Sequence, residues 1–136
     1  DFSVIKYFES MPNFITNKNV KGQIFHLQSS SQNVNLIRNS IIVLENADPG
    51  YDWIFSHNLS GLITKYGGVA SHMAIRCAEI GLPAAIGCGE ILYEKLLSAS
   101  KIMLDCKNQQ ILILENKKFE KYTQEKLILK SLGYIK

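Results

Sequence analysis

The sequence predicts a single mixed α/β domain. Short apolar runs rich in β-branched residues alternate with segments of helical apolar spacing, and glycine or proline stands at many of the junctions. The chain has 136 residues, of which 46% are hydrophobic and 20% charged. That length and composition are enough to bury one hydrophobic core.

Each element is predicted from local signals. Strands are expected where a short apolar run lies between turn residues. They fall at residues 23–27, 41–44, 61–64, 84–86, 102–104 and 111–114, the last two as a hairpin. A helix is expected from Pro49 through Phe55, with Asp48 as its N-cap. A second helix carries His72 and ends at Gly81, and a third covers residues 90–97.

Three parts are expected along the chain. Residues 1–20 are predicted to be an N-terminal linker or docking segment, residues 21–115 the main domain, and residues 116–136 a C-terminal amphipathic helix packed on it. Residues 29–35 are predicted to form an exposed polar loop. The first residue is not Met, which we interpret as the cut edge of a longer protein.

Charge and cysteine content exclude several classes of protein. The net charge is +3, and residues 115–136 hold six lysines against three glutamates, so the rest of the chain is neutral. This distribution predicts neither a nucleic-acid partner nor a membrane partner. Three cysteines without CxxC spacing argue against a disulfide framework or a zinc site, and they favour the cytoplasm.

The run from Gly67 to Ile75 carries the most chemical information. Gly67 and Gly68 allow backbone N–H groups to approach an anion, with a positive φ expected at Gly68. The first turn of the following helix leaves N–H groups unpaired at the positive end of its dipole. Ser71 and His72 stand at that helix start. The pattern predicts a phosphate cradle beside a nucleophilic imidazole.

The same segment resembles the phosphohistidine motif of the phosphoenolpyruvate-utilising enzymes. The matching positions are Gly67, Gly68, Ser71, His72, Ala74, Ile75, Glu79, Gly81, Pro83, Ala84, Gly87 and Gly89. The resemblance implies a swivelling β/β/α phosphohistidine domain within a larger enzyme, similar to phosphoenolpyruvate synthase or pyruvate phosphate dikinase. It implies that His72 is the catalytic residue and that Gly67, Gly68, Ser71 and Thr64 bind phosphate.

The resemblance also implies where the rest of the chemistry lies. We expect this chain to bind no cofactor or metal of its own. Mg²⁺ and ATP are expected on an ATP-grasp partner domain, and a further domain is expected to bind the acceptor, pyruvate or phosphoenolpyruvate. The alternatives are the carrier of an enzyme similar to rifampin phosphotransferase, or a degenerate, non-catalytic swivel domain.

Several positions keep a structural alternative. Ser71 can act as a helix cap, and Thr64 can equally serve strand packing. His26 and His57 match nothing in the family pattern, so they are interpreted as surface or strand histidines. Two further positions depart from the pattern. Ala70 replaces a frequent Thr, and Ala78 replaces a common Arg, whose role cannot be transferred to Arg76.

Overall fold

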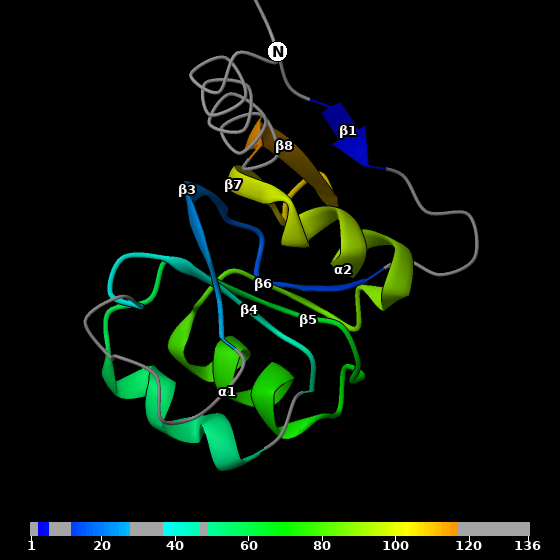
Figure 1. Ribbon diagram of the computed structural model, residues 1–136. Helices are drawn as coiled ribbons and strands as arrows, with labels where there is room; N and C mark the ends of the chain where they lie inside the picture. Colours follow the sequence, from blue (N-terminus) through cyan, green and yellow to red (C-terminus); the bar gives the residue numbers. More distant parts are fainter. Residues whose placement is uncertain (1–2, 6–11, 28–36, 47–48, 117–136) are drawn as a thin grey trace, which may run out of the picture.

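The computed structural model describes residues 3–5, 12–27, 37–46 and 49–116, and it confirms the mixed α/β class (Figure 1). The described strands form one eight-stranded sheet in the order β1-β8-β7-β3-β4-β5-β6-β2. The strands are β1 (Ser3–Ile5), β2 (Asn13–Ile15), β3 (Asn19–His26), β4 (Ile41–Leu44), β5 (Gly61–Thr64), β6 (Ala84–Ile86), β7 (Ala99–Asp105) and β8 (Gln110–Asn116). The helices are the 3₁₀ helix η2 (Pro49–Ser56) and the α-helices α1 (His72–Ile80) and α2 (Gly89–Leu97).

Strand β3 belongs to two parts of the sheet. Its first five residues pair antiparallel with β7, and its last three pair parallel with β4. The strand therefore starts at Asn19, four residues before the predicted start at residue 23. The pattern missed residues 19–22 because their side chains are exposed or only half-buried, so no apolar run marks them.

The parallel part, β3 to β6, is covered on both faces (Figure 1). One core packs α2 against β4, β5, β7 and β8, with Leu92 and Leu96 buried from the helix. The other core packs α1 and η2 against the opposite face, with Met73 and Cys77 buried from α1 and Ile54 from η2. All four residues of β4 are buried, as its continuous apolar run predicts.

The parallel pairing of β4 with β5 determines which loops meet. Leu44 and Thr64, the last residues of the two strands, are partners in the ladder. Helix η2 follows β4 and helix α1 follows β5. The start of α1 and the residues of η2 therefore come from the same edge of the sheet, where the carboxyl ends of parallel strands present loops to ligands.

The remaining predictions concern the N-terminal segment and residues that the structure does not describe. Strand β2 lies in the segment predicted as a linker or docking segment, and it pairs antiparallel with β6. The predicted loop at 29–35, the Asp48 cap and the C-terminal helix lie outside the described residues. Within the described residues, no helix is long and apolar enough to cross a membrane.

Candidate functional site

Helix α1 presents His72 at its first residue, as the sequence predicts. The Ser71 hydroxyl accepts a hydrogen bond from the backbone N–H of Ala74 at 3.4 Å, which caps the helix start. The helix ends where Gly81 takes the left-handed conformation, with φ of 71°. Because the cap holds the first turn, the His72 side chain projects from a fixed backbone position, and 43% of it is exposed.

The two glycines of the turn before α1 have different roles. Gly67 has a positive φ of 125°, whereas Gly68 does not, so the positive φ expected at Gly68 was wrong. A Cβ at Gly68 would meet nothing within 4 Å. A Cβ at Gly87 would lie 2.2 Å from the carbonyl oxygen of Gly67, so the close approach joins Gly67 to Gly87. The conformational demand lies at these two glycines, and Gly68 faces open space.

The turn carries backbone donors that are available to an anion. Among the described residues, the N–H groups of Gly68, Val69 and Ala70 have no hydrogen-bond acceptor. All three residues are exposed. The first N–H groups of α1 add to them, because the start of an α-helix leaves its donors unpaired. The arrangement provides several donors and the positive end of a helix dipole beside His72.

Asp52 holds His72 from the neighbouring helix η2. Its Oδ1 lies 2.9 Å from His72 Nε2 and 3.4 Å from Arg76 Nε. The hydrogen bond from His72, followed by the charge of Arg76, holds the pKa of the Asp52 carboxyl below its usual value, so the carboxylate is ionised at neutral pH. The site thus contains an imidazole, a carboxylate and a guanidinium in direct contact.

Sequence reasoning missed Asp52 and left Arg76 without a role. Arg76 lies four residues after His72, and this spacing places the two on the same face of α1. Its guanidinium also lies 5.3 Å from the centre of the Phe55 ring. Asp52 is 20 positions from His72, and no local pattern marks it. Only the parallel pairing of β4 with β5 brings η2 to the start of α1.

Thr64 is the last residue of β5 and is fully buried. Its hydroxyl donates to the Tyr66 carbonyl oxygen at 2.8 Å and accepts from the Gly87 N–H at 3.0 Å. Both interactions join the glycine turn to the segment after β6. Of the two roles open to Thr64, this position favours the structural one.

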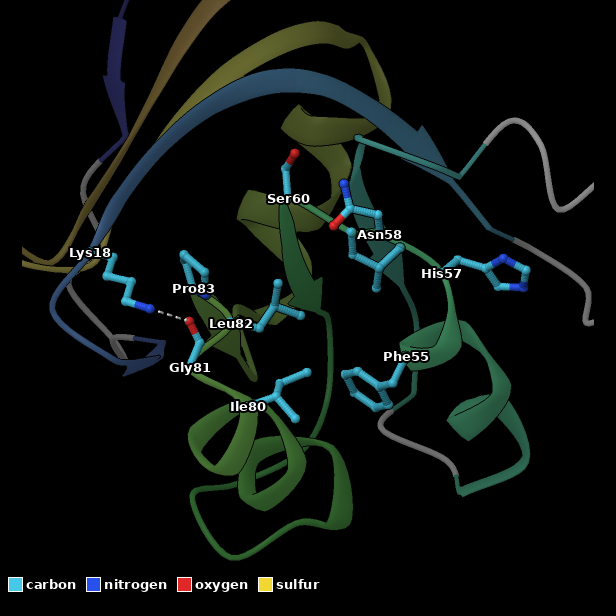
Figure 2. A pocket seen from close by; sticks show the side chains of 10 residues that line it. Lys18, Phe55, His57, Asn58, Ser60, Ile80, Gly81, Leu82 and Pro83 are labelled. Carbon is cyan, nitrogen blue, oxygen red and sulfur yellow. Dashed lines mark hydrogen bonds between the residues drawn. The ribbon is translucent and has the colours of Figure 1, made fainter.

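The other two histidines take part in different contacts. His26 ends β3 and hydrogen-bonds through its ring to the Tyr93 hydroxyl of α2. His57 packs edge-on against Trp53 and lines a pocket of about 360 Å³ at the C-terminal end of α1, opposite the His72 end. In Figure 2 the Lys18 amine reaches the Gly81 carbonyl oxygen, a distance of 2.9 Å, while the His57 ring points away from both.

Cys77, Cys88 and Cys106 are buried and free, so none of them is in a disulfide. Burial raises the pKa of Cys77 and of Cys88 to about 12, so neither is a thiolate at neutral pH. Within the described part of the chain, no three His, Cys, Asp or Glu side chains are grouped to hold a metal ion.

The described α/β domain exposes a histidine at a capped helix start, beside a glycine turn whose amides are open, an arrangement suited to holding an anion next to an imidazole. Residues 36–109 match the model of the family described as PEP-utilising enzyme, mobile domain. The chain therefore belongs to that family, as the sequence motif indicated.

The relatives that match are much longer than this chain. The chain is 26% identical to phosphoenolpyruvate synthase of Neisseria meningitidis over 86 residues, which are 63% of this chain and 11% of that protein. It is 30% identical to phosphoenolpyruvate synthase of Escherichia coli over 66 residues, 48% of this chain and 8% of that protein. It is 38% identical to rifampicin phosphotransferase of Bacillus cereus over 56 residues, 41% of this chain and 6% of that protein. The chain thus matches about a tenth or less of the length of these relatives.

Proposed function

We propose that this chain is the phosphoryl-carrier domain of a larger phosphotransferase similar to phosphoenolpyruvate synthase, with His72 as the residue that receives and passes on the phosphoryl group. The observation that carries the proposal is the position of His72. Its exposed imidazole stands at the capped start of α1, beside the open amides of residues 68–70, and Asp52 contacts the ring.

The chemistry follows from this arrangement. A neutral imidazole attacks phosphorus with the lone pair of one ring nitrogen, forming the N–P bond as the P–O bond to the donor breaks and its electrons leave with the donor. Phosphoryl transfer asks mainly for positioning and for neutralisation of charge. The open amides and the helix dipole supply hydrogen bonds to the transferred oxygens. Ser71, whose hydroxyl caps the helix, contributes by fixing the helix start.

The exposure of His72 fits a carrier. A nucleophile that meets a donor and an acceptor in turn has to be reachable from outside the domain. In this proposal Mg²⁺ and ATP are bound by an ATP-grasp domain, and a separate domain binds phosphoenolpyruvate or pyruvate. A swing of the carrier between them moves the phosphoryl group.

The test is phosphoryl labelling of the enzyme that contains this chain. After incubation with Mg-ATP or phosphoenolpyruvate we expect an acid-labile, base-stable phosphate on His72, because a phosphoramidate bond has that stability. His72→Ala should abolish it, and His57→Ala, which alters a histidine at the other end of α1, should leave it. Label that survives His72→Ala, or that maps to Ser71 or His57, would contradict the proposal. Absence of any label in the unaltered enzyme would favour a non-catalytic swivel domain.

One observation favours a second candidate for the phosphoryl acceptor. The match to rifampicin phosphotransferase is 38% identical, a higher identity than either phosphoenolpyruvate synthase match described above. The labelled enzyme should therefore be offered pyruvate and rifampicin separately. Rapid loss of the label to one of them identifies the acceptor class.

A further inference from the structure

One carboxylate oxygen links the two cationic or potentially cationic groups at the site. Asp52 Oδ1 accepts from His72 Nε2 at 2.9 Å and from Arg76 Nε at 3.4 Å. The contact between Arg76 Nη1 and Glu79 Oε1 is longer, at 3.8 Å. In the unphosphorylated site, Asp52 is thus the nearest described anion to the guanidinium.

Phosphorylation changes the charge balance around this oxygen. A phosphoryl group on the ring places close to two negative charges beside His72 at neutral pH. Asp52 then faces a like charge at short range, while Arg76 faces an opposite charge that can accept two hydrogen bonds from a guanidinium. Arg76 extends from the same face of α1 as His72, so it can reach the phosphoryl group without a change of backbone.

We infer that Asp52 and Arg76 have opposite effects on phosphohistidine at residue 72. Arg76 leaves the Asp52 carboxylate, binds the phosphoryl group and retains that group on the ring. Asp52 repels the phosphoryl group. This inference rests on the proposed function and assigns two positioning residues to it. Neither residue is among those that the family motif marks in this chain. Together they keep the phosphoryl group bound and still transferable.

The direction of each effect follows from electrostatics. In hydrolysis, the water oxygen bonds to phosphorus, the N–P bond breaks and its electron pair returns to the imidazole nitrogen. A carboxylate beside the ring favours the ring's cationic form, which is the better leaving group, and it also destabilises the phosphoryl anion. Removing Asp52 should therefore slow the loss of phosphate, and removing Arg76 should accelerate it.

The experiment uses phosphoramidate as the phosphoryl donor, because this small molecule needs no partner domain. Ammonia leaves as its P–N bond breaks and the imidazole nitrogen bonds to phosphorus. The purified chain is phosphorylated, the donor is removed, and the phosphohistidine signal is followed by ³¹P NMR. The signal of residue 72 is the one that is missing in His72→Ala.

Asp52→Asn is expected to slow the first-order loss of this signal about two- to five-fold, and Arg76→Gln to accelerate it by about the same factor, as exposed charge pairs allow. Glu94→Gln on α2 is the matched control, since it removes one exposed carboxylate that is not in contact with the site, and it should leave the rate unchanged. Circular dichroism of each variant checks its fold.

Opposite shifts distinguish this inference from a structural role, because damage to the site would move both rates the same way. Equal rates in all variants, or shifts of the same sign, would overturn the inference and leave the proposed function standing. Failure of the whole enzyme to label His72 from Mg-ATP or phosphoenolpyruvate would instead overturn the proposed function.

Discussion

At the scale of single residues, the glycines around His72 separate into two kinds. Gly67 and Gly87 have positive φ and approach each other closely, whereas Gly68 has neither constraint. Glycine is required at Gly67 and Gly87 for the shape of the turn. At Gly68 we propose that its advantage is a bare backbone that an anion can approach.

This difference gives a paired prediction for stability. Gly87→Ala should lower the free energy of unfolding by at least the roughly 1–3 kcal/mol that a strained backbone costs, because its Cβ would also lie 2.2 Å from the Gly67 carbonyl oxygen. Gly68→Ala should change it by less than about 0.5 kcal/mol. Urea denaturation of the two variants measures both values.

The same glycine tests the phosphate cradle. Gly68→Val should reduce phosphoryl transfer by the full enzyme strongly, because its side chain would obstruct the approach of the phosphoryl oxygens to the backbone N–H groups. Loss of one oriented donor at a site of developing charge costs about 10²–10³ in rate in other enzymes. Its thermal melting should stay near that of the wild type. Normal transfer by a folded Gly68→Val enzyme would mean that access to the Gly68 backbone is not needed to hold the phosphoryl group.

At the scale of elements, Thr64 joins the end of β5 to the segment that follows β6. Its buried hydroxyl pairs the Tyr66 carbonyl oxygen and the Gly87 N–H. We expect Thr64→Val, which keeps the shape, to lose about 1–3 kcal/mol for each buried polar group left unpaired. Thr64→Ser keeps the hydroxyl and should lose less. Chemical denaturation compares them, and an equal loss in both would assign the effect to packing of the methyl group.

Between elements, prediction from sequence succeeded where the signals are local. Helix α1 ends where predicted because the residue that follows it, Gly81, is a helix-terminating glycine. Strands β4 and β5 have their predicted bounds because each is a short, fully buried run. The early start of β3 was missed because its exposed residues are fixed by pairing with β7, a partner about 80 residues away.

At the scale of the whole molecule, the sequence predicted only those residues of the candidate site that are contiguous along the chain. His72, Ser71 and the glycine turn are contiguous, so a motif identifies them. Asp52 enters only through the β4–β5 pairing that sets η2 beside α1, and Arg76 gains its role only once Asp52 is in place. A sequence pattern identifies the proposed nucleophile, and the fold supplies the charged residues that contact it.

The last prediction follows from the proposal that one domain binds ATP and another carries the phosphoryl group. The sequence has no glycine-rich nucleotide loop with basic and metal-binding partners, and His72 is open to solvent. Without a domain that binds ATP and aligns its phosphates, the chain lacks the positioning on which phosphoryl transfer depends. The 136-residue chain alone should therefore release no phosphate from Mg-ATP above the buffer rate and should acquire no label from it.

The same preparation should still accept phosphate from phosphoramidate. That result would mean that its histidine can be phosphorylated and that only the ATP-binding donor site is missing. Phosphate release and ³²P incorporation, measured over a range of ATP concentrations, provide the test. Saturable ATP turnover by the chain alone would contradict the prediction, because saturation requires a nucleotide site within these residues. Labelling by ATP that appears only when the rest of the enzyme is added would place the donor on another domain, as a mobile carrier requires.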